Sequence, residues 1–341
     1  MRPLLLATAL ATIFALHAAC APAPVSPIAP HAASTCSAAS PETPAPSASA
    51  APVVSAGASP TVPSSSARTP PPPPAFTQAL EAAKKAIAAG DPATADTQID
   101  AAFSAAGDDP HLAYLVARLR ATRFAYTGDF ERAAATIVAV IPALAKHPEL
   151  PDEFWSHNSM MMIREAQGDP AAALAENDQA TLCAARGTWD PKGRDTLAFQ
   201  KDRWHRAYLT RMLAESRAGS TKEALVQYAR AALDEYRTRE GFPDSVAVLD
   251  AYFAALDGRR AEALAAAKRV DPAKDDDVED LYLVVVGLEA GGDRAAAEEV
   301  RRVMRRPGSV HIARAIMLRW LDIDTKAPRA PGFTPWHAAT R

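Results

Sequence analysis

Cysteine and aromatic residues are scarce in this chain. Of its 341 residues only three are cysteine, at positions 20, 36 and 183, and aromatic residues make up 6%. No CxxC pair occurs, which excludes the commonest spacing of structural zinc sites and thiol–disulfide centres. The hydrophobic residues, 48% of the chain, include much alanine. Because alanine has the best helix propensity, this composition predicts thin, closely packed helices rather than sheets.

Catalytic and phosphate-binding motifs are missing as well. The chain has no HExxH, no Walker loop, no GxSxG and no GxGxxG after a strand, so the best-defined enzyme classes find no support. The formal net charge of −3 is close to balance, and it does not indicate nucleic-acid binding. We therefore expect a non-enzymatic protein without a cofactor, a bound metal ion or a nucleic-acid partner.

Long apolar runs are absent too, and none reaches the roughly 20 residues that a membrane-spanning helix needs. The longest, Leu4 to Leu16, follows Arg2 and leads into small residues that end at Cys20. A positive residue, a short apolar run and small residues at a cleavage point are typical of a signal peptide. We predict a signal peptide over residues 1–19.

The ending Ala18-Ala19-Cys20 resembles the signal of bacterial lipoproteins, in which the cysteine becomes the lipid-modified first residue. The resemblance implies lipid on Cys20, membrane contact through that lipid, and a place in the bacterial cell envelope. Ala21 lacks the acidic character that retains many such proteins in the inner membrane, so the outer membrane is expected. The alternatives are secretion into the periplasm with a free or disulfide-bonded Cys20, and a retained anchor.

Residues 20–75 consist largely of Pro, Ala and Ser and end in RTPPPPPAF. Such a segment cannot bury enough apolar surface to offset the ordering of its backbone. Proline fixes φ and removes N–H donors, which favours extended polyproline II. We predict a disordered tether that holds the following domain away from a membrane; a PxxP ligand for a partner domain is a weaker alternative.

A repeated pattern follows the tether. Six times the chain has glycine, four intervening residues and then alanine: Gly90/Ala95, Gly128/Ala133, Gly168/Ala173, Gly219/Ala224, Gly258/Ala263 and Gly292/Ala297. Glycine ends a helix at low cost in a left-handed cap. The Asp or Ser that usually follows can cap the next helix, and the alanine lets that helix lie close to the first. The pattern therefore predicts helical hairpins.

The pattern resembles the tetratricopeptide repeat, a helix–turn–helix unit of 34 residues with Gly before the turn and Ala early in the second helix. The resemblance implies an α-solenoid of about six hairpins over residues 76–321, with a final helix near Val310–Leu321 and a tail over 322–341. The six glycines of this chain are 34 to 51 residues apart, so the hairpins have diverged from the 34-residue unit of the family. A non-repeating helical bundle is the alternative.

In that family the first helix of each hairpin lines a concave groove. The resemblance places these residues in the groove: Arg118, Thr122, Trp155, Asn158, Met162, Arg206, Leu213, Tyr252 and Tyr282. Aromatic, cationic and amide side chains together suit a peptide or protein ligand. We thus predict a protein-interaction scaffold; the alternatives are an accessory subunit of an envelope enzyme and a purely structural lipoprotein.

Three local clusters need separate interpretation. In KDRWHRAYLTR, Trp204 and Arg206 are candidate binding residues, but a solvated basic face with Trp and Tyr turned inward is the alternative. His157, Met160 and Met161 share a helix face, which favours core or contact surface over a Cu(I) site. Cys183 is expected to be a small buried residue. The extra length around residues 185–200 predicts a loop on the binding face.

Overall fold

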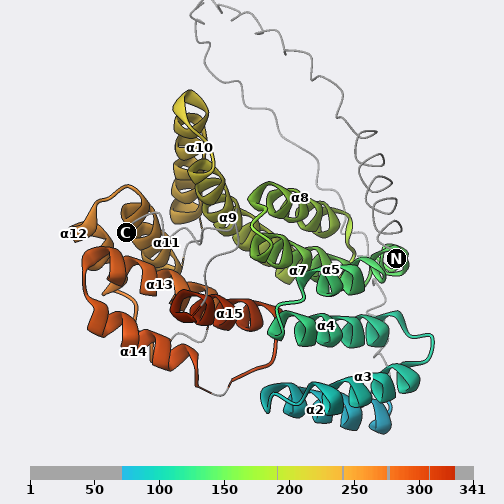
Figure 1. Ribbon diagram of the computed structural model, residues 1–341. Coiled ribbons are helices and arrows are strands. Elements are labelled where there is room, and N and C mark those ends of the chain that lie inside the picture. Colours follow the sequence, from blue (N-terminus) through green and yellow to red (C-terminus); the bar gives the residue numbers. More distant parts are fainter. Residues whose placement is uncertain (1–70, 190, 240–241, 275–276, 307, 327–341) are drawn as a thin grey trace, which may run out of the picture. The chain divides into compact units, whose positions relative to one another are not determined.

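The computed structural model describes residues 71–189, 191–239, 242–274, 277–306 and 308–326, all within the unit Arg68–Arg341. Side chains are described for these ranges except 191–201 and 321–326. Within this part of the chain every regular element is a helix, so the predicted all-α class is confirmed (Figure 1). The predicted signal peptide, Cys20, nearly all of the tether and most of the tail lie outside the described residues.

Twelve of the described helices form six consecutive hairpins, each turning at one of the six predicted glycines. The hairpins are α2 (Pro74–Ala88) with α3 (Pro92–Ala106), α4 (Pro110–Tyr126) with α5 (Phe130–Val138), α7 (Asp152–Ala166) with α8 (Pro170–Arg186), α9 (Pro191–Glu215) with α10 (Gly219–Arg239), α11 (Pro243–Leu256) with α12 (Arg260–Ala267), and α13 (Val278–Gly291) with α14 (Arg294–Met304). A four-residue helix, α6 (Ile141–Leu144), follows α5, and α15 (Ile312–Lys326) ends the described chain.

All six repeat glycines adopt positive φ, between 59° and 88°. At Gly128, for example, the N–H of Asp129 reaches back to the carbonyl of Phe124, and the Asp129 carboxylate accepts the N–H of Arg132. The same helix-ending bond and aspartate cap recur at Asp91, Asp169 and Asp293. Left-handed glycine and a capping aspartate satisfy the free backbone groups of both helix ends.

Five of the six repeat alanines are completely buried, as the hairpin prediction requires; they are Ala95, Ala133, Ala173, Ala263 and Ala297. Ala224 is the exception and is exposed. Its helix α10 packs mainly against α9 and only marginally against α11, and its buried residues start at Ala229. The fourth hairpin thus keeps the glycine turn but not the close approach next to it.

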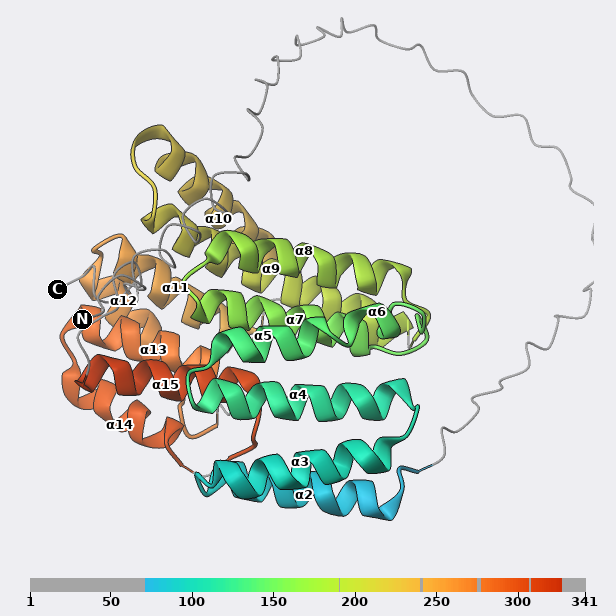
Figure 2. The ribbon, with the colours of Figure 1, turned by 45° about the vertical axis from the view of Figure 1, so that its right-hand side comes forward.

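Neighbouring hairpins pack on one another, with α3 against α4, α5 against α7, α8 against α9, and α12 against α13. The last helix breaks this order, because α15 packs against α13 and also against α4 and α7 of the second and third hairpins (Figure 2). In a strictly one-dimensional array each repeat would contact only its neighbours. The C-terminal helix therefore connects the last hairpin to earlier ones.

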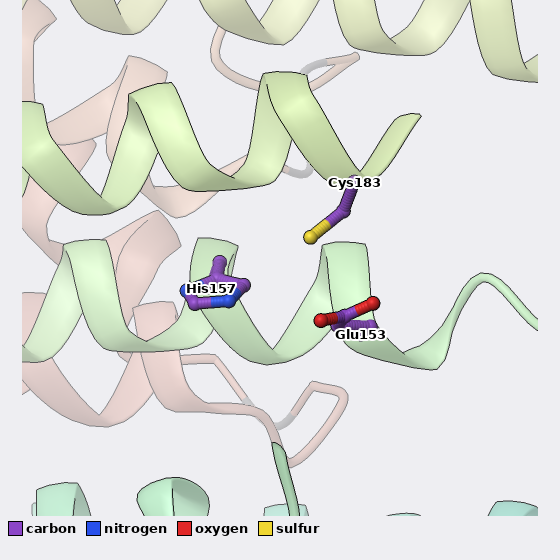
Figure 3. Close-up of side chains that lie close together, drawn as sticks. All are labelled: Glu153, His157 and Cys183. Carbon is purple, nitrogen blue, oxygen red and sulfur yellow. The ribbon is translucent and has the colours of Figure 1, made fainter. Parts of the chain in front are cut away.

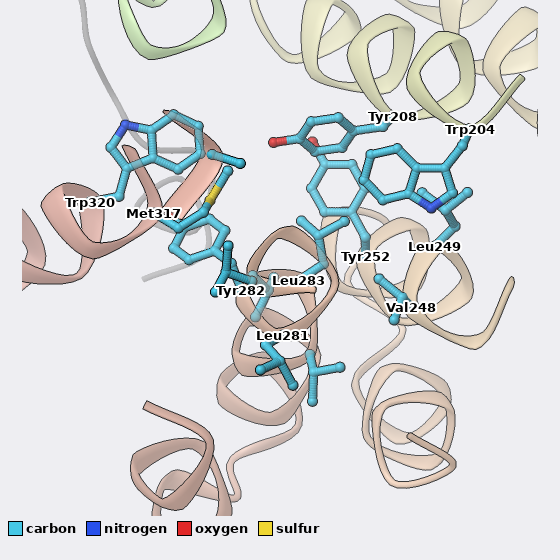
Figure 4. Packing of buried hydrophobic residues seen from close by; sticks show 14 of the residues in the cluster. Trp204, Tyr208, Val248, Leu249, Tyr252, Leu281, Tyr282, Leu283, Met317 and Trp320 are labelled. Carbon is cyan, nitrogen blue, oxygen red and sulfur yellow. The ribbon is translucent and has the colours of Figure 1, made fainter. Parts of the chain in front are cut away.

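The largest apolar core runs from the second hairpin to α15, and Figure 4 shows the part of it between Trp204 and Trp320. Its aromatic centre joins Trp204 and Tyr208 of α9 to Tyr252 of α11, with ring centroids 5.3 and 5.2 Å apart. Tyr282 of α13 meets Trp320 of α15 at 5.2 Å. A smaller core holds α2, α3 and part of α4 together.

Two predicted boundaries shift and one expectation is wrong. The first helix begins at Pro74, inside the predicted tether, and α15 continues to Lys326, inside the predicted tail. The extra length before the fourth turn was expected to form a loop, but it lengthens α9 to 25 residues instead. No helix in the described ranges is both long and apolar enough to span a membrane.

Candidate partner-binding cavity

A cavity of about 300 Å³ lies where α4, α7 and the start of α15 meet. Four of the predicted groove residues line it: Arg118 from α4, and Trp155, Asn158 and Met162 from α7. The α7 residues occupy positions i, i+3 and i+7, which form one stripe of a helix. We call this space the α4–α7 cavity.

The rest of the wall comes from elements far apart in the sequence. Tyr114 lies one turn before Arg118 on α4, and the start of α13 contributes Asp277 and Glu279. The segment before α15 and its first residues close the cavity with Ser309, His311, Ile312 and Ala313. Local sequence patterns could not have identified this last group, because it reaches the cavity only through the docking of α15 on α4 and α7.

A second hollow of about 450 Å³ adjoins the first. Arg118, Ser309 and His311 line both of them, while α2 adds Leu80 and Lys84 to the second. Thr122, another predicted groove residue, also lines this second hollow. The two hollows together follow the first helices of the first three hairpins, the face that the repeat resemblance assigns to the groove.

Charge and burial shape the α4–α7 cavity. Burial raises the pKa of Tyr114 to about 12, against the opposing charge of nearby Arg118. The Tyr114 hydroxyl is buried and makes no hydrogen bond within the described part of the chain. Burial also raises the pKa of Asp152, although its contact with His111 Nδ1 at 2.7 Å opposes that change. The cavity is therefore lined by the Arg118 cation and by a tyrosine whose hydroxyl is buried.

Two polar side chains that line the cavity, Asp277 and His311, form hydrogen bonds at the N-terminal ends of helices. Asp277 caps α13 by accepting the N–H of Glu279 at 2.9 Å. His311 Nδ1 accepts the N–H of Arg314 at 3.2 Å in the first turn of α15. Both side chains hold helix ends in place, so the wall of the cavity is positioned by capped helices.

The remaining groove candidates lie elsewhere. Tyr252 and Tyr282 are almost completely buried in the main core, where α15 covers Tyr282 through Trp320. Trp204 is also buried, with Tyr208 turned inward beside it. These three residues pack the interior and are not available to a partner in this structure.

Arg206 lies half-buried on the opposite side of α9 from the core and pairs with Asp178 at 2.7 Å and Asp202 at 2.5 Å. Burial lowers its pKa, but the hydrogen bonds to Asp202 and Asp178 and the charges of these two aspartates together raise it above the usual value. The arrangement matches the alternative interpretation of this helix, a charged face with its aromatic residues inward. Met160 and Met161 likewise belong to the core.

Searches against protein-family models, curated proteins and solved structures gave no match.

Proposed function

We propose that this protein is a non-enzymatic scaffold that binds a peptide or protein segment in the α4–α7 cavity. The supporting observation is that Arg118, Trp155, Asn158 and Met162, chosen from repeat position alone, line one cavity. Aromatic residues, Met and Arg are enriched where proteins bind one another. The Asn158 amide in the same cavity offers hydrogen bonds to a peptide backbone.

In this proposal the hairpins form a diverged tetratricopeptide-like solenoid whose groove is divided. Docking of α15 against α4, α7 and α13 fills the C-terminal part of the groove, which explains why Tyr282 is a core residue. Tyr252 packs instead against Tyr208 of α9. The part next to α2, α4 and α7 keeps open space. A partner segment would then bind at this N-terminal part.

The proposed location is the bacterial cell envelope, with lipid on Cys20 and the tether of residues 20–75 as spacer. A lipid-anchored binding domain needs a linker long enough to hold it away from the membrane surface, and a Pro-rich segment is an extended linker of this kind. Secretion without lipid is the alternative location.

The alternative function is an accessory subunit of an envelope enzyme, because His311, Asp277 and Glu279 bring titratable groups to the cavity wall. The capping roles of His311 and Asp277 favour binding over catalysis, since a group committed to a helix end is poorly placed to exchange protons with a substrate. A purely structural lipoprotein is the third alternative.

Site-specific photocrosslinking in living cells tests the proposal. A photoreactive residue replaces Met162 in the cavity, and in a matched control it replaces Leu182, which is 56% exposed on α8. We expect position 162 to give one reproducible protein adduct, and we expect this adduct to be absent when the photoreactive residue is at position 182. Identical adducts from both positions, or none from position 162, would contradict a binding role for the cavity.

A further inference from the structure

Three side chains with metal-binding chemistry meet between α7 and α8. The two that come from α7 lie on a different face of that helix from the residues that line the α4–α7 cavity. The three are Glu153 and His157 of α7 and Cys183 of α8 (Figure 3). One ligand atom from each lies within 4.8 Å of the other two. Glu153 and Cys183 are buried and His157 is half-buried, so this is not a group of solvated surface charges.

The helices explain why the three meet. Glu153 and His157 are four residues apart, one turn along the same face of α7. Cys183 comes from the last turns of the antiparallel partner helix, in a small core with Phe154, Ala180 and Ala184. Zinc bonds of about 2.0 to 2.3 Å bring neighbouring donor atoms to within about 4 Å of one another. Small side-chain rotations are therefore enough to place all three around one ion.

His157 is also held as metal-binding histidines usually are. Its Nδ1 lies 2.7 Å from a carboxylate oxygen of Glu176, and both side chains are largely buried. A carboxylate on one ring nitrogen fixes the ring and leaves Nε2 for the metal. In Figure 3 the imidazole lies on the same side of α7 as the Cys183 sulfur and the Glu153 carboxylate.

A positive group already lies between two of the three side chains. The Arg186 guanidinium forms an ion pair with Glu153, and its Nη2 lies 3.4 Å from the Cys183 sulfur. The Arg186 side chain is 54% exposed, so it is free to turn into solvent. The cluster therefore attracts a cation, and the residue that now neutralises it is able to leave.

We propose that Glu153, His157 and Cys183 bind one zinc ion, with a fourth position open to water. Mixed sulfur, nitrogen and oxygen donors suit zinc better than magnesium or calcium, which prefer oxygen alone. No local spacing indicates this site, because its ligands lie on two helices and Cys183 is 26 residues beyond His157. The inference replaces the expectation of a metal-free protein and does not depend on the partner-binding proposal.

Isothermal titration of Zn²⁺ into the untagged full-length chain tests the site. Cys20 and Cys36 are replaced by Ser in every sample, so that Cys183 is the only thiol present. We expect one ion per chain, and at least a hundredfold weaker binding in Cys183→Ser and in His157→Ala. Co²⁺ should add a thiolate-to-metal absorption band that Cys183→Ser abolishes.

Three further variants make the result specific. Glu176→Gln keeps all three ligands, and we expect it to weaken binding by about 10- to 100-fold through His157 alone. His147→Ala removes a histidine that pairs with Glu149 in a loop, and it should leave binding unchanged. Glu153→Gln is isosteric and should also weaken binding. It replaces His157→Ala as the test if that variant loses its helical circular dichroism.

The proposal is overturned if the parent protein with Cys20→Ser and Cys36→Ser takes up no Zn²⁺, or if adding Cys183→Ser or Glu153→Gln to it leaves binding unchanged. It is also overturned if His147→Ala removes binding as fully as His157→Ala, since the ion would then lie elsewhere.

Discussion

The hydroxyl of Tyr208 donates a hydrogen bond to Glu165 inside the main core. Glu165 comes from the end of α7 and Tyr208 from the middle of α9, and both are at most 2% exposed. Burial raises the pKa of Glu165 from 4.5 to about 8, against the smaller opposing effect of the Tyr208 bond. The carboxyl group is therefore protonated in the folded protein at neutral pH.

This pair makes stability depend on pH in a definite direction. Between pH 4.5 and about 8 the unfolded chain loses the Glu165 proton while the folded chain retains it. The free energy of unfolding therefore falls as pH rises through this window and levels off above it. Each unit of pKa difference corresponds to about 1.4 kcal/mol.

Glu165→Gln should remove that dependence, because glutamine keeps the acceptor for Tyr208 and carries no proton to lose. We expect the variant to equal wild type near pH 4.5 and to be more stable by a few kcal/mol at pH 8. Denaturant unfolding at several pH values measures the difference. Glu223→Gln, on the exposed side of α10, is the control and should keep the pH dependence of wild type. If Glu165→Gln is as pH-dependent as wild type, Glu165 is not the group responsible.

Close packing at the repeat alanine can be tested with two alanines in the same repeat position. Ala263 is completely buried and Ala224 is exposed. Ala263→Leu should destabilise the protein by about 1–3 kcal/mol, because overpacking shifts neighbouring helices. Ala224→Leu should change stability by less than about 0.5 kcal/mol. Equal effects in thermal unfolding would contradict the difference in burial between these two alanines.

The role of Trp204 follows from its burial. Trp204→Ala should cost about 3–5 kcal/mol of stability, as truncating a buried Trp does. Arg206→Ala removes a half-buried ion pair with Asp178 and Asp202, and it should cost distinctly less. Denaturant midpoints compare the two variants. A Trp204→Ala protein of wild-type stability would place this side chain on the surface after all.

The lipid prediction concerns Cys20, which lies outside the described residues. Cys20→Ser removes the acceptor for lipid, so the protein should move from the membrane fraction to the soluble fraction of expressing cells. Fractionation followed by immunoblotting measures this, with Cys36→Ser as the matched control. A Cys20→Ser protein that stays with membranes would rule out the lipoprotein interpretation.

Local signals predicted much of the fold. Five of the six glycines follow the end of a helix at positive φ, as predicted, because this backbone geometry selects for glycine within a few residues. Gly219 also has positive φ, but it begins α10, since α9 already ends at Glu215. Aspartates such as Asp129 cap as expected for the same local reason. Ala224 was mispredicted because its burial depends on whether a second helix covers α10, and the chain near position 224 contains no information on that.

The candidate site was only partly predictable. Repeat position correctly grouped Trp155, Asn158 and Met162 on one face of α7, since helical spacing fixes a face. It could not show that α15 would cover Tyr282, because a distant helix decides that burial. The meeting of His157 with Cys183 is likewise a contact between helices, without a local spacing to reveal it.

The affinity of the crosslinked partner for purified variants decides whether it binds in the α4–α7 cavity. Calorimetry compares wild type with Arg118→Ala, Trp155→Ala and Met162→Ala, and with Tyr228→Ala as a control that is 53% exposed on α10. We predict that at least one of the three cavity variants weakens binding by about 2 kcal/mol or more, with helicity retained and the control unchanged. If all three cavity variants bind the partner as wild type does, the α4–α7 cavity is not the binding site.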